Sequence, residues 1–286
     1  MSYAILAAFA VMLLWGAADY LIQKLCRIIG NLETLLLIDL TAAVLLLPLV
    51  LHDIASLTTA SIPLMLTLGA IGWLSGIVSF EALRAGKLSV IDAVLVMELP
   101  FTIILGIMFF GDAIGTAQWA LIAAVIAGTA LVSLETLDAR RIFGKVEKGA
   151  ALALLAALIF AAMNFLTAAA SRQASPAIAI WFPWTVSALL SGALLWRQKR
   201  LQAMPAKVAS SMKLSAATAL TAVLGWLLYA AAVSGGELSI ITAITEGYVA
   251  VAVLLGVSAN REKLARHQAL AAAAVIAATI GLAMTA

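Results

Sequence analysis

The chain has 286 residues, of which 65% are hydrophobic and only 11% are charged, and its mean hydropathy is +1.13. Soluble domains carry roughly 25% charged residues, so this composition excludes an ordinary soluble domain and predicts a polytopic membrane protein. The net charge of +3 does not indicate nucleic-acid binding, because the basic residues lie in short segments between apolar runs. The single cysteine, Cys26, excludes an internal disulfide and a cysteine-based metal cluster, and we expect neither metal nor cofactor.

Ten apolar segments follow one another along the chain, each about long enough to cross a bilayer as a helix. Barrel strands would alternate with a period of two, and these runs do not, so we predict an all-α membrane protein with ten transmembrane helices. No Lys or Arg precedes the first run, so we expect no cleavable signal peptide. The segments are residues 4–23, 32–51, 62–83, 88–110, 117–134, 149–170, 176–196, 214–233, 238–257 and 267–285.

The basic residues lie in alternate connections between these segments. Sixteen of the 17 Lys and Arg residues follow an odd-numbered segment, and Arg172 is the exception. Short basic loops stay on the cytoplasmic side. The charges therefore predict a multi-pass protein of the cell (inner) membrane, with odd-numbered loops in the cytoplasm and both termini outside.

The sequence contains an internal duplication. The run Leu88–Ala93 (Leu-Ser-Val-Ile-Asp-Ala) returns 150 positions later at Leu238–Ala243 (Leu-Ser-Ile-Ile-Thr-Ala), and the offset holds without a gap as far as Gln118 and Gln268. A fixed offset over such a length indicates two related copies.

Each copy contains five of the ten segments. An odd number of spans forces the second copy to enter the membrane in the opposite sense, which predicts two inverted five-helix repeats with a binding site where they meet. The basic stretch between them is the one plausible linker. We therefore predict a first repeat at residues 1–135, a linker at 136–148 and a second repeat at 149–286.

Several short motifs follow one another in order along the chain. They are Leu13-Leu14-Trp15-Gly16, then Glu98-Leu99-Pro100, Phe110-Gly111-Asp112 and Gln118, and in the second half Glu246, Glu262 and Gln268. With these motifs in this order, the chain resembles the drug/metabolite transporter superfamily, of the type with two EamA repeats. That family usually has Glu where this chain has Asp112. It also usually keeps both termini in the cytoplasm, opposite to the orientation that the charges predict here, and we follow the charges.

Acidic residues lie inside several of the predicted spans. Ionisable groups in hydrocarbon are costly and are functional candidates by default. No Lys or Arg lies deep in any span to neutralise them, so we expect that they are either protonated or bind a cation. These residues are Asp19, Asp39, Asp92, Glu98 and Glu246.

In the first span, Trp15, Asp19 and Gln23 recur every four residues and share one helix face. An aromatic plane beside a carboxylate suits an amine or guanidinium, through cation–π contact and a charge-assisted hydrogen bond. The alternative is that Asp19 only hydrogen bonds a neighbouring helix and Trp15 belongs to an aromatic belt.

The second copy offers matching polar positions. At an offset of about 145, Asn164 is the counterpart of Asp19, either as a fixed hydrogen-bonding group or as a contact between helices. In the ninth span Thr242, Thr245 and Glu246 lie on one face, although threonines often only bond their own backbone. Tyr248 points away from Glu246 unless the helix unwinds.

In the fourth span, Glu98 precedes Pro100 by two residues. A proline inside a helix removes a hydrogen bond and kinks it, so Pro100 is a candidate gate beside a carboxylate. Asp92 either caps this span, pairs with a base or titrates, and Asp39 is expected to make a structural hydrogen bond.

Two aromatic pairs on helix faces are expected either to wall a cavity or to pack between helices: Trp73 with Phe80, and Trp226 with Tyr229. The cluster Trp181, Pro183 and Trp184 is expected to face lipid or the interface.

The resemblance implies a cavity lined by spans 1, 3, 4, 6, 8 and 9, and the polar faces support it. No nucleotide-binding, metalloprotease or hydrolase motif is present, so we expect no enzyme. The prediction is a secondary transporter, an exporter, of a small cationic or zwitterionic metabolite such as an amino acid or amine, working by alternating access with possible proton coupling. Its partners would be that substrate and the bilayer, with no nucleic acid, and a monomer is plausible. The alternative is a sensor or assembly factor that keeps the same fold.

Overall fold

The structure is a computed structural model that describes residues 2–85, 91, 94–133, 148–260 and 265–286. All regular secondary structure within these residues is helical. The principal helices are α1 (Tyr3–Ile29), α2 (Asn31–Leu45), α3 (Leu47–Asp53), α4 (Ile62–Ala85), α6 (Glu98–Leu105), α7 (Thr116–Ser133), α9 (Lys148–Gln173), α10 (Pro176–Arg197), α11 (Met204–Ser210), α12 (Met212–Gly235), α13 (Leu238–Thr245), α14 (Tyr248–Asn260) and α15 (Arg266–Thr285). Three one-turn or π-helical pieces, η1 (Ile54–Ser56), η2 (Gly106–Phe110) and η3 (Leu201–Ala203), complete the set.

Local sequence explains where several helices begin and end. Ser175 caps α10 by accepting a hydrogen bond from the amide of Ile178, and Pro176 follows in the first turn, where no amide partner is needed. Gly30 separates α1 from α2 at φ 109°, a backbone conformation that residues with a Cβ rarely adopt. The chain therefore reverses sharply between its first two long helices.

Six described helices are long and apolar enough to cross a membrane, and a seventh results if α2 and the following α3–η1 segment, bent by 51°, are counted as one span. Three further apolar helices, Glu98–Phe110, Thr116–Val132 and Leu238–Ala252, are shorter. The chain is therefore a multi-pass membrane protein, and the ten-span layout stays a prediction.

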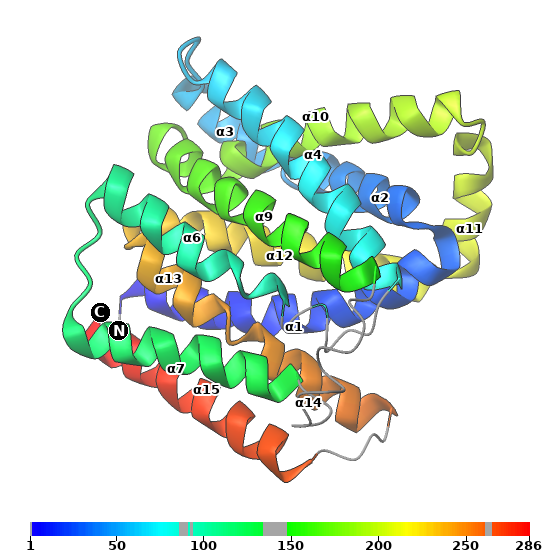
Figure 1. Cartoon of the computed structure of the whole chain (residues 1–286). Helices are drawn as coiled ribbons and strands as arrows, with labels where there is room; N and C mark the ends of the chain where they lie inside the picture. Colours follow the sequence, from blue (N-terminus) through cyan, green and yellow to red (C-terminus); the bar gives the residue numbers. More distant parts are fainter. Residues whose placement is uncertain (1, 86–90, 92–93, 134–147, 261–264) are drawn as a thin grey trace.

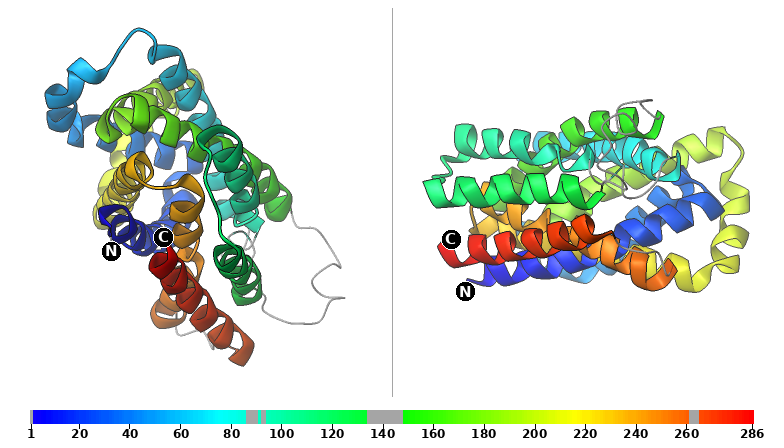
Figure 2. Two further views of the ribbon diagram at one scale, coloured as in Figure 1. Left: turned by 90° about the vertical axis from the view of Figure 1, so that its left-hand side faces the viewer. Right: turned by 60° about the horizontal axis from the view of Figure 1, so that its bottom comes forward.

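The helices form one elongated bundle in which the two halves of the chain interleave (Figures 1 and 2). Helix α1 packs against α12 and α14, α4 packs against α9 and α10, and α7 lies beside α15. Both termini lie at one end of the bundle, and the α1–α2 junction and α11 lie at the other (Figure 1).

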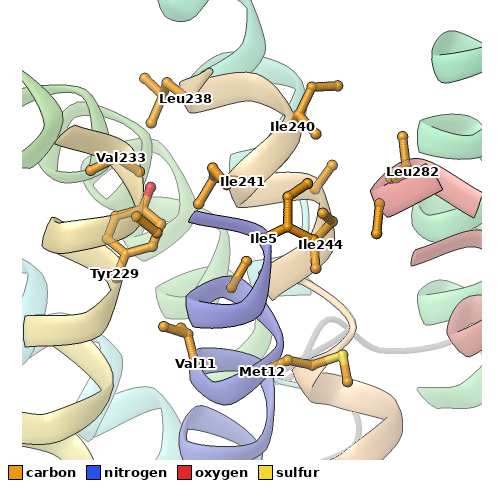
Figure 3. Packing of buried hydrophobic residues seen from close by; sticks show 14 of the residues in the cluster. Ile5, Val11, Met12, Tyr229, Val233, Leu238, Ile240, Ile241, Ile244 and Leu282 are labelled. Carbon is orange, nitrogen blue, oxygen red and sulfur yellow. The ribbon is translucent and has the colours of Figure 1, made fainter. Parts of the chain in front are cut away.

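The largest buried apolar cluster also joins the two halves. Side chains of α1 interdigitate with those of α12, α13 and α15, and Val11, Tyr229 and Ile244 are fully covered (Figure 3). The core is thus shared by segments more than 200 residues apart, which fixes the position of α1 against the second half.

Two segments predicted as continuous spans are interrupted. Residues 238–257 are divided into α13 and α14 by a turn at Glu246–Gly247, and the described part of residues 88–110 has the same turn at Val96–Met97. The two turns are 150 positions apart. In each, an amide bonds the carbonyl three residues back at matching positions: Leu99 N–H to Val96 O (3.0 Å) and Val249 N–H to Glu246 O (3.4 Å).

The interruption changes the role of Pro100. We expected a kink inside a helix, but α6 begins at Glu98, so Pro100 lies in the first helical turn, where its missing amide costs little. The interruption thus lies at Val96–Met97, in the turn before the proline, and takes the form of a break rather than a kink within a continuous helix.

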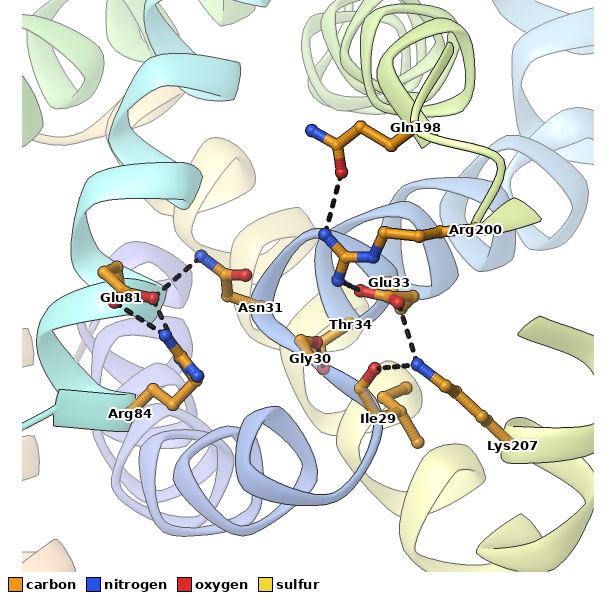
Figure 4. Close-up of polar contacts among 10 residues, drawn as sticks. All are labelled: Ile29, Gly30, Asn31, Glu33, Thr34, Glu81, Arg84, Gln198, Arg200 and Lys207. Carbon is orange, nitrogen blue, oxygen red and sulfur yellow. Dashed lines mark hydrogen bonds and ion pairs between the residues drawn. The ribbon is translucent and has the colours of Figure 1, made fainter. Parts of the chain in front are cut away.

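At the end of the bundle opposite the termini, a buried carboxylate joins the halves (Figure 4). Glu33 of α2 is fully buried and accepts from Arg200 (2.6 Å) and Lys207 (3.0 Å). Lys207 lies on α11, in the connection between α10 and α12. The predicted linker at 136–148 and Asp92 lie outside the described residues, apart from Lys148 at the start of α9.

Candidate functional site

A cavity with about 1080 Å³ of empty volume lies between the helices of the two halves. Its walls come from α1, α2, α4, α6, α9, α10 and α12, with Tyr248 at the start of α14. Helices α2 and α10 were not among the spans expected to line it. Its polar lining residues are Asp19, Asp39, Ser75, Ser79, Glu98, Thr167 and Ser187, and its aromatic ones are Trp15, Phe80, Phe160, Trp184, Trp226 and Tyr248.

Three predicted acidic residues lie together at one side of this cavity. Asp19 and Glu98 line it, and Glu98 interacts with both Asp19 and Glu246. Glu246 is fully buried behind the cavity wall, whereas Asp19 is partly exposed. The three groups therefore form a series from the cavity into the protein interior, contributed by α1, α6 and the turn between α13 and α14.

Asn164 of α9 joins this series. Its Nδ2 donates to Glu98 Oε1 at 3.0 Å, and the residue is fully buried. The bond joins α9 to α6, so it fits both roles that the sequence left open for Asn164, a fixed hydrogen-bonding group and a contact between helices. A neutral amide donor stabilises a carboxylate without neutralising its charge.

Basic residues pair elsewhere in the part of the chain that the structure describes. The ion pairs there join Glu81 to Arg84, and Glu33 to Arg200 and Lys207. Within those residues, the carboxyl groups that line the cavity form no ion pair. Among the described residues, no basic side chain therefore occupies the place that an organic cation would take beside these carboxyl groups.

An aromatic wall adjoins the acidic residues. The Trp226 ring lies 4.9 Å from Trp15 and 5.5 Å from Tyr229 between centroids, and it stacks nearly parallel to Phe160 at 6.5 Å. A Cβ at Gly225 would lie 2.7 Å from Cδ1 of Trp15, so only glycine leaves room for this ring. Trp15 is one helical turn from Asp19, which places a π-face beside a carboxylate.

The structure places two aromatic residues at the cavity. Trp184 was expected to face lipid or the interface, which is wrong: it is 8% exposed, lines the cavity and lies 6.4 Å from Trp226. Tyr248 was expected on the far side of its helix from Glu246 unless the helix unwinds. The helix breaks at Gly247, and Tyr248 lines the cavity and meets Trp15 edge-on at 6.3 Å.

Several predicted residues lie away from the cavity surface. Gln23 donates to the carbonyl of Leu83 (3.2 Å), and Trp73 donates to Ser191 (3.1 Å). Tyr229 shares a hydrogen bond with Thr242 (2.9 Å), and Thr245 donates back to the Thr242 carbonyl (2.9 Å). These last three are fully buried and support the turn that carries Glu246.

Asp39 makes the structural hydrogen bond that was expected, because Ser187 donates to it at 2.5 Å. It also lines the cavity, which the sequence did not indicate. Within the described chain, no three His, Cys, Asp or Glu side chains are grouped so that they could hold a metal ion.

The model of the EamA-like transporter family matches residues 147–284, which is nearly all of the predicted second repeat. The second half of the chain thus matches the EamA-like transporter family, and the resemblance seen in its motifs is confirmed. The match indicates a membrane transporter of the drug/metabolite type.

Comparison with solved structures agrees on the fold. The EamA-like chain superposes on one protein crystal structure with a TM-score of 0.76 and 16% sequence identity, covering 100% of this chain and 99% of the other. At that identity the likeness concerns the fold alone. No curated protein matches the chain.

Proposed function

We propose that this protein is a secondary transporter, working as an exporter, that binds a small organic amine or zwitterion in the cavity. The observation that carries the proposal is the position of Asp19 and Glu98 beside the Trp15–Trp226 wall, with no ion-pair partner among the described residues. An ammonium group there gains charge-assisted hydrogen bonds and cation–π contact together.

Proton coupling is part of the proposal. Two neighbouring buried carboxyl groups repel each other when both are ionised, so we infer that Glu98 and Glu246 share a proton. A cation that arrives at Asp19 and Glu98 favours release of that proton, because both compete for the same negative charge. Substrate and proton would then cross in opposite directions.

Two inverted repeats that rock about the cavity are the proposed mechanism. Three features at an offset of 150 support this layout: the repeated sequence, the matching helix breaks, and Gln118 and Gln268 at the starts of α7 and α15. Efflux as the direction, and an amino acid or amine as the substrate, rest on analogy with the family.

The test is flux of benzylamine in proteoliposomes under an imposed pH gradient, with Glu246→Gln, Asp19→Asn and the exposed Glu237→Gln as a control. We expect wild type and Glu237→Gln to accumulate the amine against its gradient. Asp19→Asn should lose binding, and Glu246→Gln should bind but no longer respond to the pH gradient. Normal gradient-driven flux in both Asp19→Asn and Glu246→Gln would refute the carboxylate mechanism.

The same preparation tests the alternative of a sensor or assembly factor. A ligand that binds the folded state raises thermal stability by mass action. A sensor would show that stabilisation without any flux, whereas a transporter shows both.

A further inference from the structure

One carboxyl group of the cavity has no role in the function proposed above. Asp39 on α2 is 3% exposed and lines the same cavity as Asp19. The hydroxyl of Ser187 donates to Asp39 Oδ2 at 2.5 Å, so this carboxyl accepts in the structure and keeps its second oxygen for another donor. Like Asp19, it forms no ion pair with any basic residue that the structure describes.

The two aspartates lie at similar depth on adjacent helices. Asp19 precedes the end of α1 at Ile29 by ten residues, and Asp39 follows the start of α2 at Asn31 by eight. At a rise of about 1.5 Å per residue, they lie roughly 15 and 12 Å from the α1–α2 junction. Because α2 returns antiparallel to α1, both carboxyl groups reach the cavity at nearly one level.

A row of aromatic rings connects the two positions. Trp15, one turn from Asp19, lies 4.9 Å from Trp226, which in turn lies 6.4 Å from Trp184 on α10. Trp184 precedes Ser187, the partner of Asp39, by three residues, so both face the cavity on one side of α10. An apolar spacer lying on these rings would have a carboxyl group near each end.

A second, independent feature points to a polar ligand in this cavity. Ser75 of α4 lines the cavity and is fully buried, yet its hydroxyl has no hydrogen-bond partner among the described residues. Buried hydroxyls are nearly always paired in folded proteins. A polar group that enters the cavity would supply the missing partner.

We propose that Asp39 is a second cation-binding group and that the substrate class is an organic dication. The proposal rests on the function proposed above. One ammonium group binds at Asp19 and Glu98, the other binds at Asp39, and the spacer lies on Trp226. Such a substrate carries two positive charges that are separated by one aromatic ring or by a short alkyl chain. A monoamine fills only the Asp19 end.

A matched pair of ligands tests the proposal on the purified full chain. Benzylamine and 1,4-bis(aminomethyl)benzene differ by one aminomethyl group, and binding is followed by isothermal calorimetry. In wild type the diamine should bind at least about tenfold more tightly, which is what one additional charge-assisted hydrogen bond supplies. Asp39→Asn should remove that preference and leave benzylamine affinity unchanged, because the amide keeps its shape and its bond from Ser187. Ser187→Ala should retain the preference, since the charge of Asp39 remains.

The outcomes separate this inference from the function on which it rests. If wild type binds benzylamine without preferring the diamine, or if Asp39→Asn keeps the preference, Asp39 is not a cation site and the proposed function stands. If Asp39→Asn loses both ligands while thermal unfolding shows it folded, Asp39 supports the cavity rather than a second charge, and the inference fails. If wild type binds neither ligand, the inference and the proposed amine transport fail together.

Discussion

Gln118 and Gln268 make the same kind of contact 150 positions apart. Each accepts a hydrogen bond from the amide three residues earlier, Gly115 (2.9 Å) and Ala265 (3.0 Å), and so caps the start of its own helix. Each also donates to a carbonyl near the end of the other helix, Gln118 to Thr285 (3.0 Å) and Gln268 to Val132 (2.9 Å). A glutamine side chain therefore joins α7 to α15 at each end of this helix pair.

We expect Gln118→Ala and Gln268→Ala to lower stability by similar amounts, about 1–2 kcal/mol each, because each removes a cap and an interhelical hydrogen bond. Thermal unfolding in detergent measures the loss. Gln202→Ala, at an exposed position in η3, is the control and should have no effect. A loss confined to one of the two glutamines would show that the contacts are not equivalent.

The Glu33 cluster gives a second prediction. Glu33→Gln leaves Arg200 and Lys207 without their buried partner, and both lie about 40% exposed, so water compensates them in part. The expected loss is roughly 1–3 kcal/mol. Glu81→Gln, at the more exposed pair with Arg84, is the matched control and should cost at most about 1 kcal/mol. Equal melting temperatures for the two variants would contradict the structural role of Glu33.

Gly225 and Gly192 form a matched pair of helical glycines. A Cβ at Gly225 would press on the Trp15 ring at 2.7 Å, whereas one at Gly192 would meet nothing within 4 Å. We expect Gly225→Ala to displace Trp15, change the tryptophan fluorescence and weaken benzylamine binding. Gly192→Ala should bind normally and be stabilised by up to about 1 kcal/mol through helix propensity. Unchanged binding in Gly225→Ala would show that Trp15 does not contribute to the site.

Trp226→Ala should weaken benzylamine binding by roughly 0.5–2 kcal/mol, or about two- to thirtyfold, because cation–π and stacking contacts are lost. Trp196, which is 72% exposed, provides the control substitution Trp196→Ala. Affinity is measured by calorimetry at fixed ionic strength. If both variants bind as wild type does, the aromatic wall is structural.

Membrane orientation can be tested by cysteine labelling. Cys26 is 1% exposed, so a membrane-impermeant thiol reagent should give little background. We expect Ala286→Cys to react in intact cells and Gln202→Cys, at the opposite end of the bundle, to react only after permeabilisation. The reverse pattern would overturn the orientation that the loop charges predict and restore the one usual in the family.

The sequence by itself predicted the polar residues that the structure brings together at the candidate site. Composition required a helical membrane bundle, and Asp19, Glu98, Glu246 and Asn164 were identifiable because polar groups are costly in hydrocarbon and need a reason to be there. Helical periodicity also placed Trp15 beside Asp19, since four-residue spacing fixes one face. These are properties of single segments, which is why they can be read without the fold.

The tertiary structure decided which of these residues meet. Gly247 lies in the middle of an apolar run, and the run does not show that the helix breaks there, so the position of Tyr248 depended on whether the helix unwinds. Trp184 was assigned to lipid or the interface because an apolar face looks the same whether lipid or another helix covers it. Asp39 needed the position of α10 to show that it lines the cavity beside Ser187. Contacts between distant helices depend on the packing of the whole bundle, and no local pattern encodes that packing.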